Sequence, residues 1–386
     1  MLIGFTVENY KSFFGETSLS MAATTDKEHR EFNVIPSEQG GLLKNILVYG
    51  ANASGKSNLI DALYYMKTMV SSAFDVQTEH VKSCQSFEFN ASAINKPTRF
   101  ELSFLLDGVV YEYGFDILKG QINSEYLYKK AKRRTLVFER TAPGYESIRT
   151  TPDMADVDAL KKNVRGDVLF LTWAAYANNA LAIKVVDWVS NHLIIFGFNG
   201  YKKAEDYCDA FFQNFIRKSD GDILRMKLDK GGKLLSAHKV YDESWNELPA
   251  TLYVPFEEYS SAGTKRMFDL AHVFDKTSKE PSVIVIDELD LHLHPALVRH
   301  LIALINSIEH NRGNTQLICT THDVLLLDED IRRDQIWFVD KDEHSVSTLY
   351  ALSDFKDVRK SSDILKRYLL GVYGAIPNLE RGDSDA

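Results

Sequence analysis

Residues 50–57, with the sequence GANASGKS, match the phosphate-binding pattern G-x-x-x-x-G-K-[ST] at every fixed position. They follow the apolar run 45–49, which predicts a strand, and they lead into an apolar-periodic stretch at 56–70, which predicts a helix. The pattern needs this strand–loop–helix context, because its glycines let backbone N–H groups close around phosphate oxygens at the positive end of a helix dipole. The sequence therefore predicts an α/β fold built around a phosphate-binding loop.

Two side chains of the loop have specific expected roles. Lys56 is expected to reach the β- and γ-phosphates of a nucleotide, and the Ser57 hydroxyl is expected to bind Mg²⁺. Residues 95–98 (NKPT) are similar to a guanine-reading motif but lack its aspartate, which gives no support to a preference for GTP.

A second segment far along the chain ends in two acids. Residues 283–288 (VIVIDE) are four β-branched residues followed by Asp287 and Glu288. A buried central strand would deliver Asp287 to the magnesium ion beside the phosphate loop, and Glu288 could then polarise a water for in-line attack on the γ-phosphate. Without the phosphate loop upstream, the same residues would equally predict a core strand that ends in a solvated acidic turn.

Two weaker motifs flank the acidic strand. Residues 259–266 (YSSAGTKR) open a predicted helix, where a hydroxyl and unpaired N–H groups suit phosphate binding, although alone they would predict only an N-cap. Residues 316–322 (QLICTTH) predict an apolar strand that ends at His322, a position from which a side chain can hydrogen-bond the γ-phosphate. Alone, His322 would be interpreted as an ordinary capping histidine.

Composition excludes several classes of protein. The 45 Lys and Arg are outnumbered by 54 Asp and Glu, and the formal charge of -9 disfavours a surface built for nonspecific nucleic-acid binding, though not a local basic groove. The three cysteines (Cys84, Cys208 and Cys319) are far apart, which argues against a disulfide framework and a zinc site. No apolar run reaches the roughly 18 residues of a membrane span, so we expect a cytoplasmic protein with reduced thiols.

The organisation predicted from local patterns is one α/β core interrupted by an insertion. Residues 1–95 form the first part of the core. Residues 96–254 form a lobe of β-hairpins and helices, with a hairpin turn at Asp107-Gly108, helical periodicity over 154–220 and short strands over 222–256 around a turn at 230–233. Residues 255–386 complete the core with alternating helices and strands, a β pair around 335–350, a final helix and an acidic tail.

The order of these motifs resembles an ABC-type ATPase head, a mixed sheet with a phosphate-loop helix and an inserted β/helical lobe. Within that superfamily, residues 7–13 (VENYKSF) resemble the opening strand of the SMC and RecF-like branch. Residues 50–58, 287–290 with the following His294-Pro295, and 368–377 are similar to a narrower group of prokaryotic AAA-annotated ATPases of abortive-infection and phage-defence loci. Those ATPases are often encoded beside a separate nuclease or toxin.

The resemblance implies roles for individual residues. It makes Glu288 the catalytic base, His322 the switch histidine and Asp287 a magnesium carboxylate beside Ser57. It makes Ser261 and Gly263 the signature motif, which acts across a dimer on the partner's nucleotide. The implied nucleotide contacts are Gly50, Ala51, Asn52, Ala53, Ser54, Gly55, Lys56, Ser57, Asn58, Lys11, Ser12, Ser261, Gly263 and Asp290, the last in the D-loop.

Two positions depart from the pattern of the family. The signature is Ser-Ser-Ala-Gly-Thr rather than Leu-Ser-Gly-Gly-Gln, so we expect the contact across the dimer to be weaker or shaped differently. No glutamine lies in a recognisable Q-loop motif, and Gln77 and Gln85 are the candidates.

Two functional hypotheses follow. In the first, two heads close around two ATP molecules, and hydrolysis reopens them to control an effector such as a nuclease or toxin in anti-phage defence. In the second, an SMC- or RecF-like ATPase binds DNA directly in repair or recombination. An AAA+ ring motor is disfavoured because Lys56 and Asp287 are 231 positions apart, and a transporter ATPase is disfavoured because no membrane segment is predicted.

Two further clusters have competing interpretations. His292 and His294, with Asp290, could bind a metal ion, but Pro295 predicts a helix start that would separate these side chains. Residues 129–134 (KKAKRR) hold five basic residues in six, which could contact nucleic acid or an acidic partner, or could be the solvated rim of a hairpin.

Overall fold

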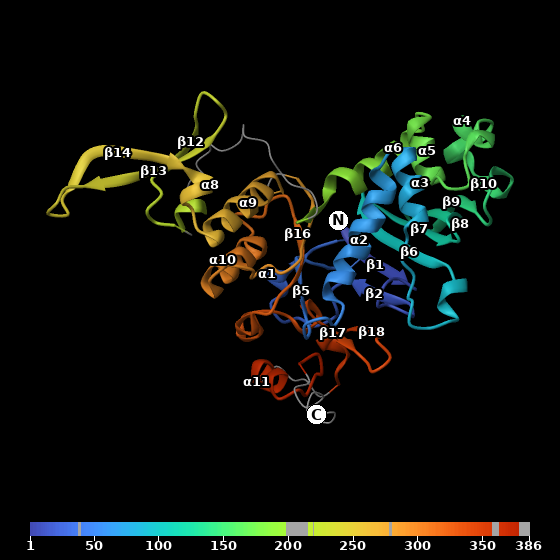
Figure 1. Ribbon diagram of the computed structural model, residues 1–386. Coiled ribbons are helices and arrows are strands. Elements are labelled where there is room, and N and C mark those ends of the chain that lie inside the picture. Colours follow the sequence, from blue (N-terminus) through green and yellow to red (C-terminus); the bar gives the residue numbers. More distant parts are fainter. Residues whose placement is uncertain (38–39, 198–214, 219, 278–279, 357–362, 378–386) are drawn as a thin grey trace.

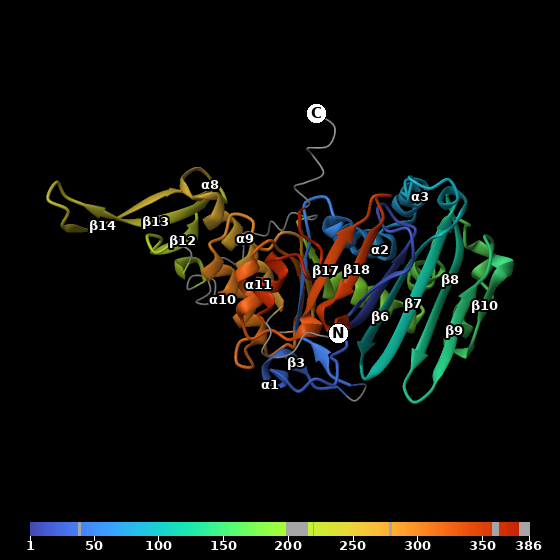
Figure 2. The same cartoon turned by 90° about the horizontal axis from the view of Figure 1, so that it is seen from below.

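The computed structural model describes residues 1–37, 40–197, 215–218, 220–277, 280–356 and 363–377. Two large sheets lie next to one another and share the helical layer between them (Figures 1 and 2). One sheet is antiparallel and the other is mainly parallel. This mixed architecture confirms the predicted α/β class.

The antiparallel sheet has the strand order β10-β9-β8-β7-β6-β1-β2. In β6, Phe100, Leu102 and Phe104 are fully buried while their neighbours are less so, the alternation typical of a sheet with one face on the core. The turn between β6 and β7 is the predicted Asp107-Gly108, and both residues have positive φ, as a tight hairpin requires. The strands are β1 (Leu2–Glu8), β2 (Thr17–Ser20), β6 (Thr98–Leu106), β7 (Val109–Leu118), β8 (Gln121–Lys130), β9 (Arg134–Arg140) and β10 (Ile148–Thr150).

The second sheet has the order β11-β15-β16-β5-β17-β18, and all neighbours except β17 and β18 are parallel. Its central strands are buried along their whole length, as expected for parallel strands covered on both faces. The strands are β11 (Leu193–Phe196), β15 (Val283–Ile286), β16 (Gln316–Thr320), β5 (Asn45–Tyr49), β17 (Ile336–Lys341) and β18 (Ser347–Ala351).

Alternate side chains of β5 face two different cores. Ile46 and Val48 pack with the apolar face of α2 (Lys56–Ser71) and with the antiparallel sheet. Leu47 and Tyr49 pack with α9 (Ala262–Thr277) and α10 (Pro295–Asn306) on the other face. The period-2 alternation of one short strand therefore fixes the phosphate-loop helix on one side of the sheet and the signature helix on the other.

The remaining elements are smaller. The other helices are α1 (Arg30–Asn33), α3 (Phe74–Lys82), α4 (Ala155–Asp158), α5 (Phe170–Tyr176), α6 (Ala180–Asp187), α8 (Phe256–Tyr259) and α11 (Ile364–Leu369), with a π-helical turn at Trp188–His192. Short 3-10 helices lie at Ala93–Asn95, Tyr145–Ser147, Pro152–Met154, Lys161–Asn163, Val324–Asp328, Arg333–Gln335 and Leu352–Asp354. The other strands are β3 (Val34–Ile35), β4 (Leu42–Leu43), β12 (Arg225–Leu228), β13 (Leu234–Tyr241) and β14 (Glu247–Pro255), and the last three form an arm that projects from the body (Figure 1).

Strand pairing corrects part of the predicted organisation. Strands β6–β10 were expected in an inserted lobe, but β6 pairs directly with β1, so the expected division at residue 96 falls inside one sheet. Residues 193–196 were expected to be helical, but they form β11 and pair with β15. The arm contains the predicted short strands, with the turn at 230–233 between β12 and β13. Whether 1–95, 96–254 and 255–386 behave as separate units stays a prediction.

Some of the features predicted from the sequence lie partly or wholly outside the described residues. Cys208, the acidic tail at 381–386 and part of the expected helical stretch lie outside the described residues. Cys84 and Cys319 are free thiols, and burial raises the pKa of Cys84 to about 11. Within the described ranges, every helix is too short or too polar to cross a bilayer.

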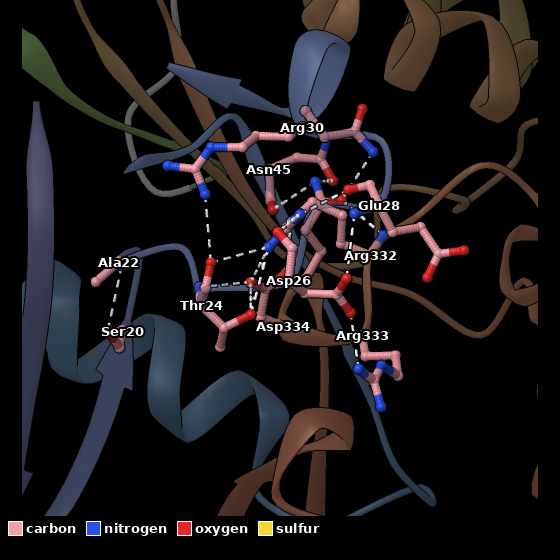
Figure 3. A network of polar contacts seen from close by, with 12 residues as sticks. Ser20, Ala22, Thr24, Asp26, Glu28, Arg30, Asn45, Arg332, Arg333 and Asp334 are labelled. Atoms are coloured by element: carbon pink, nitrogen blue, oxygen red, sulfur yellow. Dashed lines mark hydrogen bonds and ion pairs between the residues drawn. The ribbon is translucent and has the colours of Figure 1, made fainter. Parts of the chain in front are cut away.

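A buried ion pair in the segment before β17 holds the loop after β2 through further hydrogen bonds (Figure 3). Arg332 and Asp334 are 1% and 5% exposed, and their side chains lie 2.6 Å apart. Arg332 also donates to the backbone carbonyls of Asp26 and Glu28, and Asp334 accepts two hydrogen bonds from Thr24. Because each of these groups has a partner, the burial of both charges is compensated.

Candidate nucleotide-binding site

The phosphate loop runs from the end of β5 to the first turn of α2. Gly55 has a φ of 115°, a conformation that favours glycine, and it directly precedes Lys56. The Lys56 ammonium is buried and donates to the backbone carbonyls of Gly50 and Ala51 at 2.8 and 3.0 Å. Asn52, Ala53 and Ser57 are exposed, so this loop presents backbone and hydroxyl groups to solvent around a buried cation.

The acidic strand meets the phosphate loop, as the sequence predicted. Only β16 lies between β5 and β15, and these three strands are parallel, so their carboxyl ends share one edge of the sheet. Burial lowers the pKa of Lys56, and the negative charges of Asp287, Glu288 and Asp290 oppose that shift. A cation from one end of the chain and three carboxylates from the other therefore form one electrostatic unit.

Thr320, at the end of β16, orients the acidic turn. Its hydroxyl donates to Asp287 Oδ1 at 2.5 Å and accepts the backbone N–H of Glu288 at 2.7 Å. The Thr320 carbonyl accepts the N–H of Leu289 at 3.0 Å. Glu288 has a φ of 52°, which is uncommon for a side chain larger than glycine. The three contacts to Thr320 hold the turn in this conformation.

Asp290 and His322 are joined directly. The Asp290 carboxylate accepts the backbone N–H of His322, at 3.1 and 3.3 Å for its two oxygens. The His322 side chain is exposed at the same sheet edge as the acidic turn. The structure therefore brings together Asp290 and His322, for which the family resemblance implied roles in the D-loop and as the switch histidine.

The signature segment lies at the exposed start of α9. The Ser261 hydroxyl accepts the N–H of Thr264 at 3.0 Å, so it caps the helix, and the residue is exposed. Gly263 packs against the loop after the acidic turn, where a Cβ atom would lie 2.7 Å from the carbonyl oxygen of His292. Glycine is thus required at Gly263 by its contact with the D-loop segment.

Arg266, which the sequence did not single out, links the signature helix to the acidic turn. Its guanidinium donates to the backbone carbonyls of Asp287 and Glu288 at 3.2 and 3.0 Å, and it lies over the ring of Phe196 at 4.5 Å. Burial lowers the pKa of Arg266, and the nearby acids oppose the shift. The only sequence signal was a basic residue one helical turn after the signature glycine.

Lys11 and Ser12, the nucleotide contacts expected near the N-terminus, lie beside the phosphate loop, and both side chains are bound to other protein groups. Lys11 forms an ion pair with Asp61 of α2 at 2.7 Å. The Ser12 hydroxyl accepts a hydrogen bond from Asn58 Nδ2 at 2.7 Å. Ser12 also contacts Ser347, a residue that no sequence motif indicated.

The two Q-loop candidates differ. Gln77 is fully buried, where its amide donates to Ser72 O and its carbonyl oxygen accepts the N–H of Leu169, so it has a structural role. Gln85 is exposed, and its backbone carbonyl accepts the N–H of Lys11 at 3.1 Å. Gln85 is the candidate that lies next to the N-terminal segment of the site.

Members of the other two clusters are bound to neighbouring protein groups. His294 accepts the N–H of Ala296 and caps α10, and the described residues contain no group of three or more His, Cys, Asp or Glu side chains placed to hold a metal ion. In the basic run, Lys129 pairs with Asp153 and Arg134 pairs with Glu112, each at 2.6 Å. The run lies at the turn between β8 and β9, which favours the interpretation as a hairpin rim.

The donor set of the site fits Mg²⁺. Ser57 offers a hydroxyl and Asp287 a carboxylate that Thr320 orients, and Mg²⁺ prefers such oxygen ligands while keeping waters and substrate phosphates for its other positions. One or two protein ligands are sufficient for such a site, so the absence of a three-residue cluster among the described residues is compatible with it.

A protein-family model described as "AAA domain, putative AbiEii toxin, Type IV TA system" matches residues 46–328, from the start of the phosphate-loop strand to the segment after His322. The chain belongs to this AAA family. The predicted relationship to AAA-annotated ATPases of abortive infection is thereby confirmed.

Two solved structures are also similar to this AAA-family protein. The SMC head domain from Thermotoga maritima is 15% identical, with 91% of this chain and 98% of that chain covered and a TM-score of 0.42. An SMC head bound to the C-winged helix domain of ScpA is 16% identical, with 91% and 97% covered and a TM-score of 0.45. No curated protein matched the sequence.

Proposed function

We propose that this AAA-family protein binds ATP with Mg²⁺ and hydrolyses it, and that two copies close around the bound nucleotides. The parallel order β15-β16-β5, which brings Lys56 to the same edge of the sheet as Asp287 and Glu288, carries the proposal. A cation at a helix N-terminus suits the phosphates, and the neighbouring acids suit a metal ion and an attacking water.

Each residue has a distinct part in the proposed reaction. The loop N–H groups and Lys56 bind the β- and γ-phosphates and stabilise the charge that moves to them. Mg²⁺, when bound by Ser57 and Asp287, neutralises phosphate charge. Glu288 takes a proton from the water whose oxygen bonds to the γ-phosphorus, while the bond from that phosphorus to the bridging oxygen breaks and ADP keeps the electron pair.

The dimeric part of the proposal is supported by the surface position of the signature. Ser261 is exposed at the start of α9, where a second copy could reach it, and Gly263 contacts His292 of the D-loop segment. Asp290 in turn holds the backbone of His322. A contact between His322 and the γ-phosphate would therefore be connected through Asp290 to the surface that faces the partner.

We further propose that the nucleotide state holds or releases a separately encoded effector, such as a nuclease or toxin, in the cytoplasm during anti-phage defence. The family description, which names the AbiEii toxin and type IV toxin–antitoxin systems, supports this part, as do the motifs shared with ATPases of defence loci. Nucleic acid is not required in this scheme.

A direct DNA-binding ATPase is the second candidate, and one observation favours it. The turn between β8 and β9 exposes Lys130, Lys132 and Arg133 on an otherwise acidic protein. A phosphate-binding surface would give affinity that falls steeply with salt. The absence of DNA binding by the pure protein at low salt would exclude this candidate.

The Glu288→Gln variant tests the proposed function. It removes the base but keeps the size of the side chain, so we expect ATP affinity near the wild-type value, turnover lower by roughly a hundredfold or more, and a dimer that accumulates with ATP. Turnover is measured by phosphate release and the dimer by light scattering after gel filtration. Glu257→Gln, at an exposed acid on α8, is the control. Near-normal turnover by Glu288→Gln would place the base elsewhere.

A further inference from the structure

The hairpin of β17 and β18 supports both ends of the phosphate loop. At the first end, a Cβ atom on Gly50 would lie 2.4 Å from the carbonyl oxygen of Val339 in β17. At the other end, a Cβ atom on Gly55 would lie 2.3 Å from the hydroxyl oxygen of Ser347, the first residue of β18. The loop therefore has almost no space behind it, and its shape depends on what this hairpin presents.

A chain of hydrogen bonds crosses this contact. Asn58 Nδ2 lies 2.7 Å from Ser12 Oγ, Ser12 Oγ lies 2.8 Å from Ser347 Oγ, and Ser347 Oγ lies 2.5 Å from the carbonyl oxygen of Ser54. The backbone N–H of Ser347 also donates to the Ser12 carbonyl at 2.7 Å.

The directions of these bonds follow from the number of protons. The Ser54 carbonyl can only accept, so the Ser347 hydroxyl donates to it. Ser347 Oγ also donates to Ser12 Oγ, so its one proton is shared between these two acceptors, and Ser12 Oγ accepts from the Asn58 amide as well. Ser12 Oγ therefore joins α2 to β18, and Ser347 Oγ joins Ser12 to the phosphate loop, so these groups form one connected network of hydrogen bonds.

The three serines of this hydrogen-bond network are buried. Ser12, Ser54 and Ser347 are 5%, 3% and 3% exposed. Loss of the Ser347 hydroxyl would leave the Ser54 carbonyl buried next to a hydrocarbon group, and water has little access to replace it. The Ser54–Gly55 peptide would then be free to turn toward another partner.

The orientation of that peptide matters for phosphate binding. A trans peptide is planar, and its carbonyl oxygen and the following N–H point in opposite directions. Because Ser347 holds the Ser54 carbonyl toward the hairpin, the N–H of Gly55 points away from the hairpin. An N–H group fixed in this way is available to a phosphate without first paying the entropy of orientation.

We propose that Ser347, through Ser12 and Ser54, is a positioning residue for the nucleotide: it fixes the Ser54–Gly55 peptide so that the phosphate loop is preformed. This inference rests on the proposed function. It also gives Ser12 an indirect role, since its hydroxyl is used within the chain of bonds. The hydrogen bonds of Ser12, Ser54 and Ser347 join the segment after β1, the loop before α2 and the start of β18, which lie in three distant parts of the sequence.

The test compares ATP binding with turnover in Ser347→Ala. We expect the dissociation constant for ATP with Mg²⁺, measured by calorimetric titration, to rise roughly tenfold, while turnover at saturating ATP stays within about twofold of wild type. Thr348→Ala removes the hydroxyl of the next residue on β18, which is exposed, and should leave both values unchanged. A Ser347→Ala protein that binds ATP as tightly as Thr348→Ala would overturn the proposal.

A second variant tests whether the bonds act as one chain. Ser12→Ala removes the acceptor that Ser347 and Asn58 share, so Ser347 is held less firmly and ATP binding should weaken by a similar factor. This variant serves if Ser347→Ala fails to fold. The double variant should bind ATP within about twofold of the weaker single variant, because the chain is already broken. A dissociation constant that rises roughly a hundredfold in the double variant would show that Ser12 and Ser347 act independently, and it would contradict the proposal.

Wild-type protein and Lys56→Ala separate this inference from the function on which it rests. Wild type should bind ATP and Lys56→Ala should not. Failure of wild type to bind ATP would overturn the proposed function and the inference with it. Normal binding by wild type together with unchanged binding by Ser347→Ala would overturn the inference alone.

Discussion

At the scale of single residues, Thr320 shows how an unremarked side chain sets the geometry of a recognised motif. The sequence predicted the strand that ends near His322, and it predicted roles for Asp287 and Glu288. It did not predict that the Thr320 hydroxyl would bind both the Asp287 carboxylate and the Glu288 backbone N–H, because this contact depends on the pairing of β15 with β16. Arg266 and Ser347 escaped notice for the same reason, since neither belongs to a local pattern.

Replacement of Thr320 by valine should impair hydrolysis more than binding. The shape of the side chain is kept, but Asp287 loses a donor and the Glu288 N–H loses its acceptor, so the turn is no longer held. We expect turnover to fall roughly tenfold while ATP affinity changes little, as measured by phosphate release and titration. Thr320→Ser restores the hydroxyl and should recover most of the activity. A Thr320→Val enzyme with wild-type turnover would show that this contact has no part in positioning the acids.

At the scale of elements, the conformation of some short apolar runs was predicted from the sequence and that of others was not. The runs at 45–49, 283–286 and 316–320 were predicted as strands because each ends at a motif, and their parallel pairing brings those motifs to one edge. Residues 193–196 (LIIF) sit after a helical stretch and carry no motif, and four apolar residues fit a helix or a strand equally well. Pairing with β15, 90 positions later, decides the conformation of this run.

At this scale we predict that Gly263→Ala disturbs the contact between α9 and the loop that contains His292. In Gly263→Ala, the new methyl group would meet the carbonyl oxygen of His292, so the helix and the loop must move apart. We expect the free energy of unfolding in urea to fall by about 1–3 kcal/mol and the ATP-dependent dimer to weaken. Ala262→Ser changes the exposed neighbour and should alter neither quantity. Wild-type stability of Gly263→Ala would mean that this helix and loop are not in close contact in solution.

At the scale of the whole molecule, pairing between distant strands was the part that the sequence left open. The β-rich texture of residues 98–150 was predicted, but not that β6 would continue the sheet begun by β1. Hairpin neighbours can be read from turn residues, whereas partners separated by about 90 positions are chosen by burial of both faces. The same burial brings two ends of the chain to one site, and there the motif chemistry made the prediction possible.

The central claim is that the Lys56 loop and the Asp287–Glu288 turn of one copy form a site that Ser261 of a second copy completes. Mixing Lys56→Ala with Ser261→Arg tests it most directly, because each heterodimer would hold one site with an intact loop and an intact signature. Each variant alone should be inactive, and the equimolar mixture should recover roughly a quarter of wild-type ATPase activity, since about half of the dimers are mixed and each has one good site. A mixture as inactive as its components would contradict the account.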